Sequence, residues 1–85
     1  MAIDAVPRLT LYSRSYCHLC DDMVVRLRQL QAGIRFEFDV VDVDRDPVLE
    51  RRYGDKVPVL ACGERELCHY FLDPAVITAF LAEFR

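Results

Sequence analysis

Cys17 and Cys20 are the residues of this sequence whose type and spacing most directly suggest chemistry. Two cysteines about one helical turn apart can approach disulfide geometry with little movement of the backbone. An apolar stripe of helical period begins here, so we expect Cys17 to open a helix and Cys20 to lie beside the stripe. The more exposed Cys17 would then attack a disulfide, and the more buried Cys20 would resolve the mixed disulfide.

The expected position of Cys17 also bears on its acidity. Unpaired backbone N–H groups and the positive end of the helix dipole favour a thiolate at the start of a helix. Such surroundings bring a cysteine pKa from ~8.5 to ~3.5–7.5. Arg14 and a protonated His18 would add positive charge, whereas Asp21 and Asp22 oppose it. We therefore predict a pKa for Cys17 that is lowered, but not extremely so.

Cys62 and Cys68 complete the set of four cysteines and leave other interpretations open. The four cysteines, together with the histidines, could nominally form a zinc site. An iron–sulfur cluster is a related alternative. Five residues separate Cys62 from Cys68, however, and Cys17 and Cys20 open a helix instead of a tight turn. A secreted disulfide framework and a binding module without activity are further alternatives. We expect packing roles for Cys62 and Cys68, and no metal or other cofactor.

Hydrophobic periodicity predicts the elements that must position the first two cysteines. Alternating residues predict a strand at 8–12, and a helical stripe follows from Cys17 to Gly33. A second strand at about 36–43 changes phase, which predicts either cover on both faces or a bulge near Val40. The remaining elements are a short helix after Asp46 and Pro47, strands at 57–61 and about 64–69 around a Cys62 and Gly63 turn, and a last helix after Asp73 and Pro74. The order β-α-β-α-β-β-α indicates an α/β layer fold with a mixed sheet.

Pro58 stands inside an apolar strand pattern, where proline is disfavoured. One interpretation is a cis peptide bond between Val57 and Pro58 that faces the two cysteines, with Val57 backbone groups free to pair with an extended substrate. The other interpretation is a trans proline on an edge strand.

Together these features resemble the glutaredoxin branch of the thioredoxin superfamily. The segments that carry the match are Leu9 to Ser13, Cys17 to Cys20, Val41 to Asp44 with Asp46 and Pro47, Tyr53 with Gly54, and Val57 to Leu60. The resemblance implies a thioredoxin-like fold, with a four-stranded mixed sheet of order 2-1-3-4 flanked by three helices. It further implies a cis proline at Pro58 and thiol–disulfide exchange, with Cys17 as nucleophile and Cys20 as resolving thiol.

The departures from that family concern the substrate. His18 and Leu19 stand where glutaredoxins usually have Pro-Tyr, and no Gly-Gly-x-Asp turn follows the fourth predicted strand. Without glycine a peptide backbone cannot approach closely there, and Asp73 is expected to cap the last helix. We expect a divergent glutaredoxin-like protein whose substrate is a disulfide-containing protein or a glutathione mixed disulfide, with glutathione as a candidate co-substrate. The expected substrate contacts are Arg14, Tyr16, His18, Leu19, Val57 and Pro58, with Arg14 either binding a glutathione carboxylate or simply solvated.

Composition and charge exclude several other classes of protein. The 85 residues are 53% hydrophobic and 29% charged, with a net charge of −3, which excludes a disordered chain. The cationic side chains form no basic stripe, so we expect no nucleic-acid partner. No apolar run reaches the ~20 residues that span a bilayer, and residues 1–4 carry no signal pattern. We therefore expect one domain, residues 1–85, that is monomeric and cytoplasmic.

Overall fold

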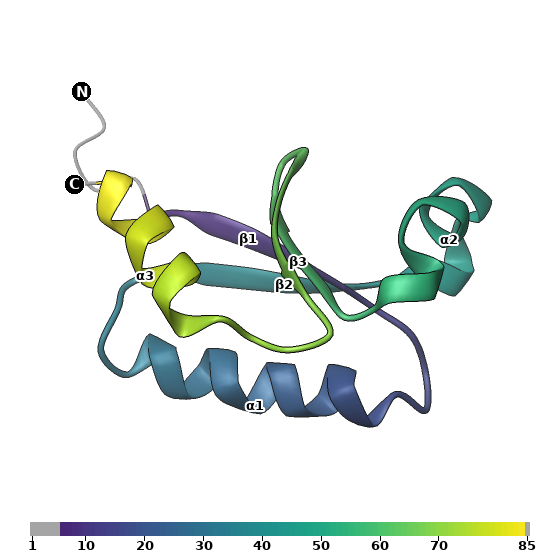
Figure 1. Cartoon of the computed structure of the whole chain (residues 1–85), viewed down its shortest axis with the longest axis horizontal. Helices are drawn as coiled ribbons and strands as arrows, with labels where there is room; N and C mark the ends of the chain where they lie inside the picture. The colour runs from purple at the N-terminus through teal and green to yellow at the C-terminus, as the bar shows by residue number, and fades with distance from the viewer. Residues whose placement is uncertain (1–5, 85) are drawn as a thin grey trace.

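The computed structural model describes residues 6–84, so the expectation about residues 1–4 lies outside the described residues. Figure 1 shows the elements in chain order. These are β1 (Arg8–Ser13), α1 (His18–Gln31), β2 (Glu37–Asp42), η1 (Val43–Arg45), α2 (Pro47–Tyr53), η2 (Gly54–Lys56), β3 (Val59–Cys62), β4 (Arg65–His69), α3 (Pro74–Leu81) and η3 (Ala82–Phe84), where η marks a 3₁₀ helix. Within residues 6–84, no helix is both long and apolar enough to cross a membrane.

The four strands form one mixed sheet of order β2-β1-β3-β4. β1 and β2 are parallel, whereas β3 pairs antiparallel with both β1 and β4. The parallel pair needs a crossover, which α1 supplies. This confirms the predicted α/β thioredoxin-like fold and its strand order.

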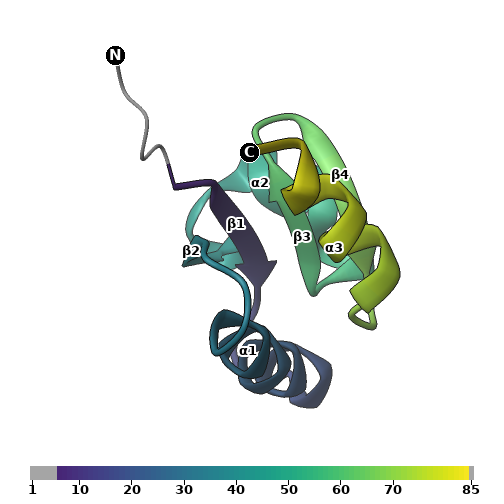
Figure 2. The same cartoon turned by 90° about the vertical axis from the view of Figure 1, so that its left-hand side faces the viewer.

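Alternate residues of β1 and β3 point into two separate apolar clusters. Leu11 and Leu60 belong to the larger cluster, which α1 and α3 cover with Met23, Leu27, Ile77, Phe80 and Leu81. Tyr12 and Val59, each one position along, pack instead in a smaller cluster with Val43 and Tyr53 of η1 and α2. Since side chains alternate across a strand, the two clusters lie on opposite faces of the sheet. Figure 2 shows α3 alongside the β3–β4 hairpin.

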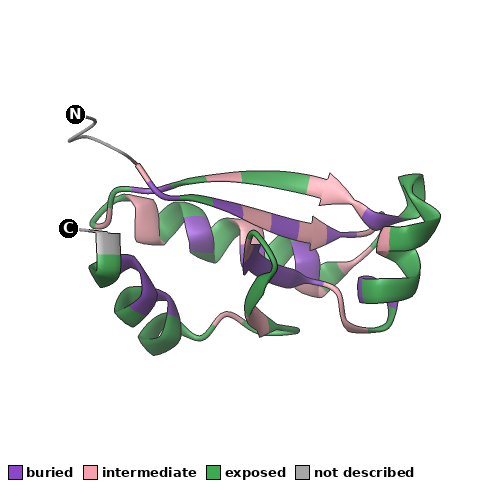
Figure 3. Ribbon diagram, turned by 90° about the horizontal axis from the view of Figure 1, so that it is seen from above, coloured by how far each residue is buried: buried purple, intermediate pink, exposed green. Residues whose placement is uncertain are grey.

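β2 differs from the prediction. Its pairing with β1 is continuous from Glu37 to Asp42, so it has no bulge near Val40. Val40 is 51% exposed, so the strand is not covered on both faces either (Figure 3). The phase change has another cause, because Val43 already belongs to η1 and turns into the smaller cluster.

The β3–β4 hairpin is also shifted from the prediction. The ladder of β3 begins at Val59, one residue after Pro58, because proline has no N–H to donate. Cys62 still pairs with Arg65, so the turn consists of Gly63 and Glu64. Gly63 takes a φ of +60°, a conformation that glycine adopts without a steric penalty.

Both predicted acid caps are present. Asp46 accepts a hydrogen bond from the backbone N–H of Val48 at the start of α2. Asp73 accepts hydrogen bonds from the N–H groups of Ala75 and Val76 at the start of α3. In each helix proline follows the cap, where its missing N–H costs nothing.

Candidate functional site

Cys17 and Cys20 form a disulfide, with their Cα atoms 5.2 Å apart. This separation lies within the usual range of about 4.4–6.8 Å for disulfides. The backbone therefore places the two cysteines where a disulfide can form.

Cys17 is the N-cap residue of α1. Its backbone is extended, with φ −116° and ψ 105°, and its Sγ accepts a hydrogen bond from the backbone N–H of Cys20 at 3.1 Å. The first four N–H groups of a helix have no partner within the helix, and here the sulfur takes the place that a cap oxygen usually fills. The expected position of Cys17 at the helix start is thus observed. Its lowered pKa stays a prediction, since a disulfide sulfur does not titrate.

The two sulfur-bearing residues differ in exposure. Cys20 is only 3% exposed and lies on the same helix face as Met23 and Leu27, three and seven residues further on. Cys17 is half-buried because it stands at the helix end, outside that face. This is the asymmetry that the sequence predicts for an attacking and a resolving cysteine.

The side chains around the disulfide are largely open to solvent. Tyr16 is fully exposed and has a φ of +57°, and His18 is also exposed. Leu19 is half-buried between the two cysteines. These residues lie on the loop and first turn that carry Cys17.

Val57 and Pro58 are joined by a cis peptide bond, as the resemblance implies. Pro58 is buried, and its carbonyl accepts a hydrogen bond from the N–H of Tyr70 at 2.9 Å. Val57 is half-buried against the smaller cluster.

The sheet brings the two segments of the candidate site to the same end of the molecule. β1 is antiparallel to β3, with Tyr12 opposite Val59, so the end of β1 and the beginning of β3 coincide. The loop to Cys17 therefore leaves the sheet where Val57 and Pro58 enter it. β2 also ends there, with Asp42 opposite Ser13.

A groove of about 320 Å³ adjoins the disulfide-bearing helix, between α1 and the loop that leads into α3. Leu19 lines it from within the cysteine motif, and the wall across from it is apolar or aromatic. The complete lining is Leu19, Asp22, Arg26, Tyr70, Phe71, Leu72 and Pro74. The sequence signal for this groove is a run of large apolar residues directly after a strand, of which Phe71 is 69% exposed. The absence of glycine from this loop does not reveal the groove.

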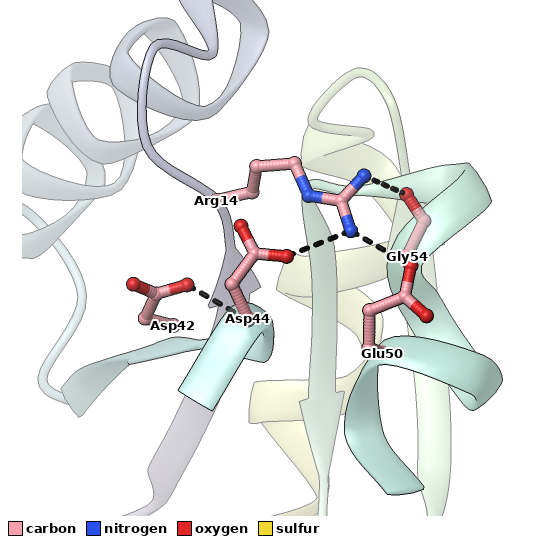
Figure 4. Close-up of polar contacts among 5 residues, drawn as sticks. All are labelled: Arg14, Asp42, Asp44, Glu50 and Gly54. Carbon is pink, nitrogen blue, oxygen red and sulfur yellow. Dashed lines mark hydrogen bonds and ion pairs between the residues drawn. The ribbon is translucent and has the colours of Figure 1, made fainter. Parts of the chain in front are cut away.

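Arg14 does not extend freely into solvent. Its guanidinium contacts Asp44 of η1, Glu50 of α2 and the carbonyl of Gly54 (Figure 4). Binding of a substrate carboxylate by Arg14 therefore stays a prediction, and it would require exchange of these contacts. The sequence did not identify Asp44, Glu50 and Gly54 as partners of Arg14, because each lies at least 30 residues away from it along the chain.

Cys62 and Cys68 are free, half-buried thiols. Burial raises the pKa of the Cys68 thiol, and the backbone of Asp73 partly offsets this through a hydrogen bond. No group of three or more His, Cys, Asp or Glu side chains is placed to hold a metal ion in the part of the chain that the structure describes.

The class of protein is that of thioredoxin-like domains. It is defined by the sheet, by the Cys-x-x-Cys pair at the N-terminus of the first helix and by the cis proline. The sequence matches the family model "Glutaredoxin-like domain (DUF836)" over residues 8–82. The chain therefore belongs to the glutaredoxin-like domain family. Its fold and its Cys17–Cys20 pair fit a redox function.

Solved structures share the fold of this chain. Protein Ne2328 from Nitrosomonas europaea is 45% identical, with a TM-score of 0.81 over 89% of this chain and 92% of that one. Protein XcR50 from X. campestris is 42% identical, with a TM-score of 0.69 over 88% of this chain and 96% of that one. Glutaredoxin C1 from Populus tremula x tremuloides, in its holo form, shares the fold at 17% identity and a TM-score of 0.54, over 98% of this chain and 90% of that one.

A curated relative is an uncharacterized protein of Mycobacterium tuberculosis. It is 27% identical over 81 residues, which are 89% of this chain and 84% of that protein.

Proposed function

We propose that this protein is a thiol–disulfide oxidoreductase that reduces disulfides through Cys17 and Cys20. The observation that carries the proposal is the hydrogen bond from the Cys20 N–H to the Cys17 sulfur at the start of α1. In the reduced chain the same amide would donate to a thiolate, and hydrogen bonds to a charged acceptor are stronger than those to a neutral one. Stabilising the thiolate makes Cys17 the nucleophile.

Two exchange steps account for the reaction. The Cys17 thiolate attacks one sulfur of the substrate disulfide, forming a mixed disulfide and releasing the other sulfur as a thiolate that takes up a proton. Cys20 then loses its proton and attacks the Cys17 sulfur, which forms the Cys17–Cys20 disulfide and releases the second substrate thiolate. Two electrons pass from the protein to the substrate. A thiol reductant, either glutathione or a thioredoxin reductase, must return them.

The substrate contacts that we propose are Tyr16, His18, Leu19, Val57 and Pro58. The exposure of Tyr16 and His18 beside Cys17 supports contact with an incoming chain. The groove beside Leu19, walled by Tyr70 and Phe71, favours an extended polypeptide that carries the disulfide as the occupant. Apolar side chains gain most from burial in such a groove.

Cysteine variants test the mechanism. With a protein disulfide as substrate, Cys17→Ser should abolish turnover, because the nucleophile is lost. Cys20→Ser should stop after the first step, and intact mass measurement should find the mixed disulfide on Cys17. Cys62→Ser is the matched control and should keep the wild-type rate. If Cys17→Ser reduces the substrate as fast as the wild type, the proposal is wrong.

The source of electrons is tested separately. Wild-type protein is supplied with glutathione in one reaction and with a thioredoxin reductase in another, and reduction of the same substrate is followed. The faster reaction identifies the class of reductant. If neither reductant reopens the Cys17–Cys20 disulfide, the catalytic cycle proposed here fails.

A further inference from the structure

Arg14 connects the loop that carries Cys17 to the opposite side of the candidate site. Its Nη2 lies 3.0 Å from Asp44 Oδ1 and 2.9 Å from Glu50 Oε2. Its Nη1 donates to the carbonyl of Gly54 at 3.3 Å. One guanidinium thus holds η1, α2 and the first residue of η2, and Figure 4 shows the three contacts converging on it. We call these four residues the Arg14 cluster.

The geometry of the cluster is that of an internal tie. The Arg14 side chain is 33% exposed, and its Nε is buried without a hydrogen-bond partner among the described residues. Arginine suits this task because its planar fork can reach several acceptors at once, which a lysine ammonium does less well. The two carboxylates raise the pKa of the guanidinium through these hydrogen bonds, Glu50 more than Asp44.

Gly54 supplies independent support for the cluster. Its backbone is helical, with φ −55° and ψ −34°, so any residue could adopt it. A Cβ at this position, however, would come within 2.6 Å of Glu50 Oε2 and 3.0 Å of Arg14 Nη2. A Cβ would therefore force the end of the flexible Glu50 side chain away from Arg14 and weaken their contact.

The rest of the loop offers little to hold Cys17. Ser15 and Tyr16, which lie between Arg14 and Cys17, are both exposed, and Tyr16 has a positive φ. On the other side, Gly54 is the first residue of η2, and Val57 directly follows this 3₁₀ helix. The Arg14 cluster therefore joins the two segments that meet at this end of the sheet, the loop to Cys17 and the segment leading into Val57 and Pro58.

We propose that Arg14 is a positioning residue, which fixes the Cys17 loop against the segment leading into Val57 and Pro58. This inference rests on the proposed function. Disulfide exchange needs the attacking sulfur aligned with the substrate S–S bond, and small misplacements of reacting atoms are costly in rate. Arg14 acts on this alignment through the loop and not through contact with the substrate.

The experiment compares two reactions of the reduced protein. Arg14→Gln should lower the rate of protein-disulfide reduction about tenfold. Arg14→Lys keeps the positive charge, so its rate of alkylation by iodoacetamide, measured across pH, should match the wild type, because a small reagent needs only the thiolate. A lysine ammonium cannot reach the same three acceptors as the guanidinium, so Arg14→Lys should reduce the protein disulfide about as slowly as Arg14→Gln. Gly54→Ala keeps every charge and should lower the rate in the same direction, though less.

Arg8→Gln is the matched control. Arg8 makes a two-point ion pair with Asp39 at 2.7 and 2.8 Å, at the other end of β1 from the disulfide. This variant should reduce the substrate at the wild-type rate. Thermal unfolding of each variant checks the fold, and Gly54→Ala carries the test if Arg14→Gln does not fold.

The outcomes separate the two proposals. Wild-type rates in both Arg14→Gln and Gly54→Ala would overturn the positioning role and leave the proposed function intact. A wild-type rate of protein-disulfide reduction in Arg14→Lys, with a loss of reduction in Arg14→Gln, would also overturn it, since Arg14 would then act through its charge. A wild-type protein that reduces no disulfide refutes the proposed function itself.

Discussion

At the scale of single residues, burial separates the cysteines by chemical role. Cys68 packs against the larger cluster from β4, and burial raises the pKa of its thiol. A thiol with a raised pKa remains protonated and is a poor nucleophile. Cys17 instead has its sulfur at a helix N-terminus, in contact with a backbone N–H. One chain thus contains an inert cysteine and a candidate reactive one, set apart by surroundings alone.

Cys68 leads to a prediction about stability at alkaline pH. The folded chain holds the Cys68 proton to a higher pH than the unfolded chain, whose thiol titrates near ~8.5. The free energy of unfolding should therefore fall as the pH rises above that value, through the folded pKa of Cys68. Cys68→Val should reduce this alkaline loss, as measured by urea unfolding at pH 7 and pH 10 on the oxidised protein.

Tyr53 also contributes to the loss of stability at alkaline pH. Burial also raises the pKa of Tyr53, so part of the alkaline loss should persist in Cys68→Val. Cys62→Val retains Cys68 and should keep the whole loss. Identical pH dependence of Cys68→Val and the wild type would contradict the prediction.

At the scale of elements, the loop between β4 and α3 joins the candidate site from two directions. The Tyr70 hydroxyl donates to the carbonyl of Asp55 in η2, and its N–H donates to the carbonyl of Pro58. Tyr70 takes a φ of +63°, which turns the chain toward α3. Phe71 is left 69% exposed on the wall of the groove. The loop is therefore anchored at Tyr70, and Phe71 remains exposed at the groove.

Phe71→Ser tests whether the groove receives the substrate. Because the side chain is exposed, the free energy of unfolding should change by less than about 0.5 kcal/mol. Loss of its apolar surface should raise the KM for a protein disulfide about tenfold. The KM for a small-molecule disulfide should stay that of the wild type, because such a substrate does not fill the groove. Steady-state kinetics with both substrates gives the answer. Val25→Ser, exposed on α1, is the control and should alter neither KM. An unchanged KM for the protein substrate would exclude the groove.

At the scale of the whole molecule, the protein has one short dimension. Its principal extents are 37 × 25 × 16 Å, so the sheet and its helices leave depth for one sizeable apolar cluster. The smaller cluster depends on few residues, among them Tyr53, whose ring stacks on Tyr12 at 4.2 Å between centroids. A domain of this size is expected to be stable by about 4–13 kcal/mol in total. Each core side chain therefore carries a large share of the stability.

Leu11 and Val40 form a matched pair for measuring that share. They are direct partners across β1 and β2, but Leu11 is fully buried and Val40 is 51% exposed. Leu11→Ala should lower the free energy of unfolding by about 2–5 kcal/mol, because it leaves a cavity in the larger cluster. Val40→Ala should cost about 0.5 kcal/mol or less. Urea unfolding at neutral pH measures both, and equal costs would contradict the placement of the core.

Local features were predictable because their causes lie within a few residues. The helix after Cys17, the caps at Asp46 and Asp73 and the buried face of Cys20 depend on neighbours within one or two turns. The structure departs from the prediction at Val40 and at the Cys62 and Gly63 turn. Hydrophobic periodicity does not show whether a strand lies at the edge of a sheet, and it does not fix the position of a hairpin turn to within one residue.

Spacing along one strand or helix was enough to predict the Cys17–Cys20 motif, the order of the main elements and the acid caps. The folded arrangement was needed to find the partners of Arg14, which are 30, 36 and 40 residues away along the chain. It was also needed to find the walls of the groove, where α1 meets the loop before α3. A side chain several bonds long can reach many acceptors, and which of them it meets depends on how the sheet brings distant loops to one end.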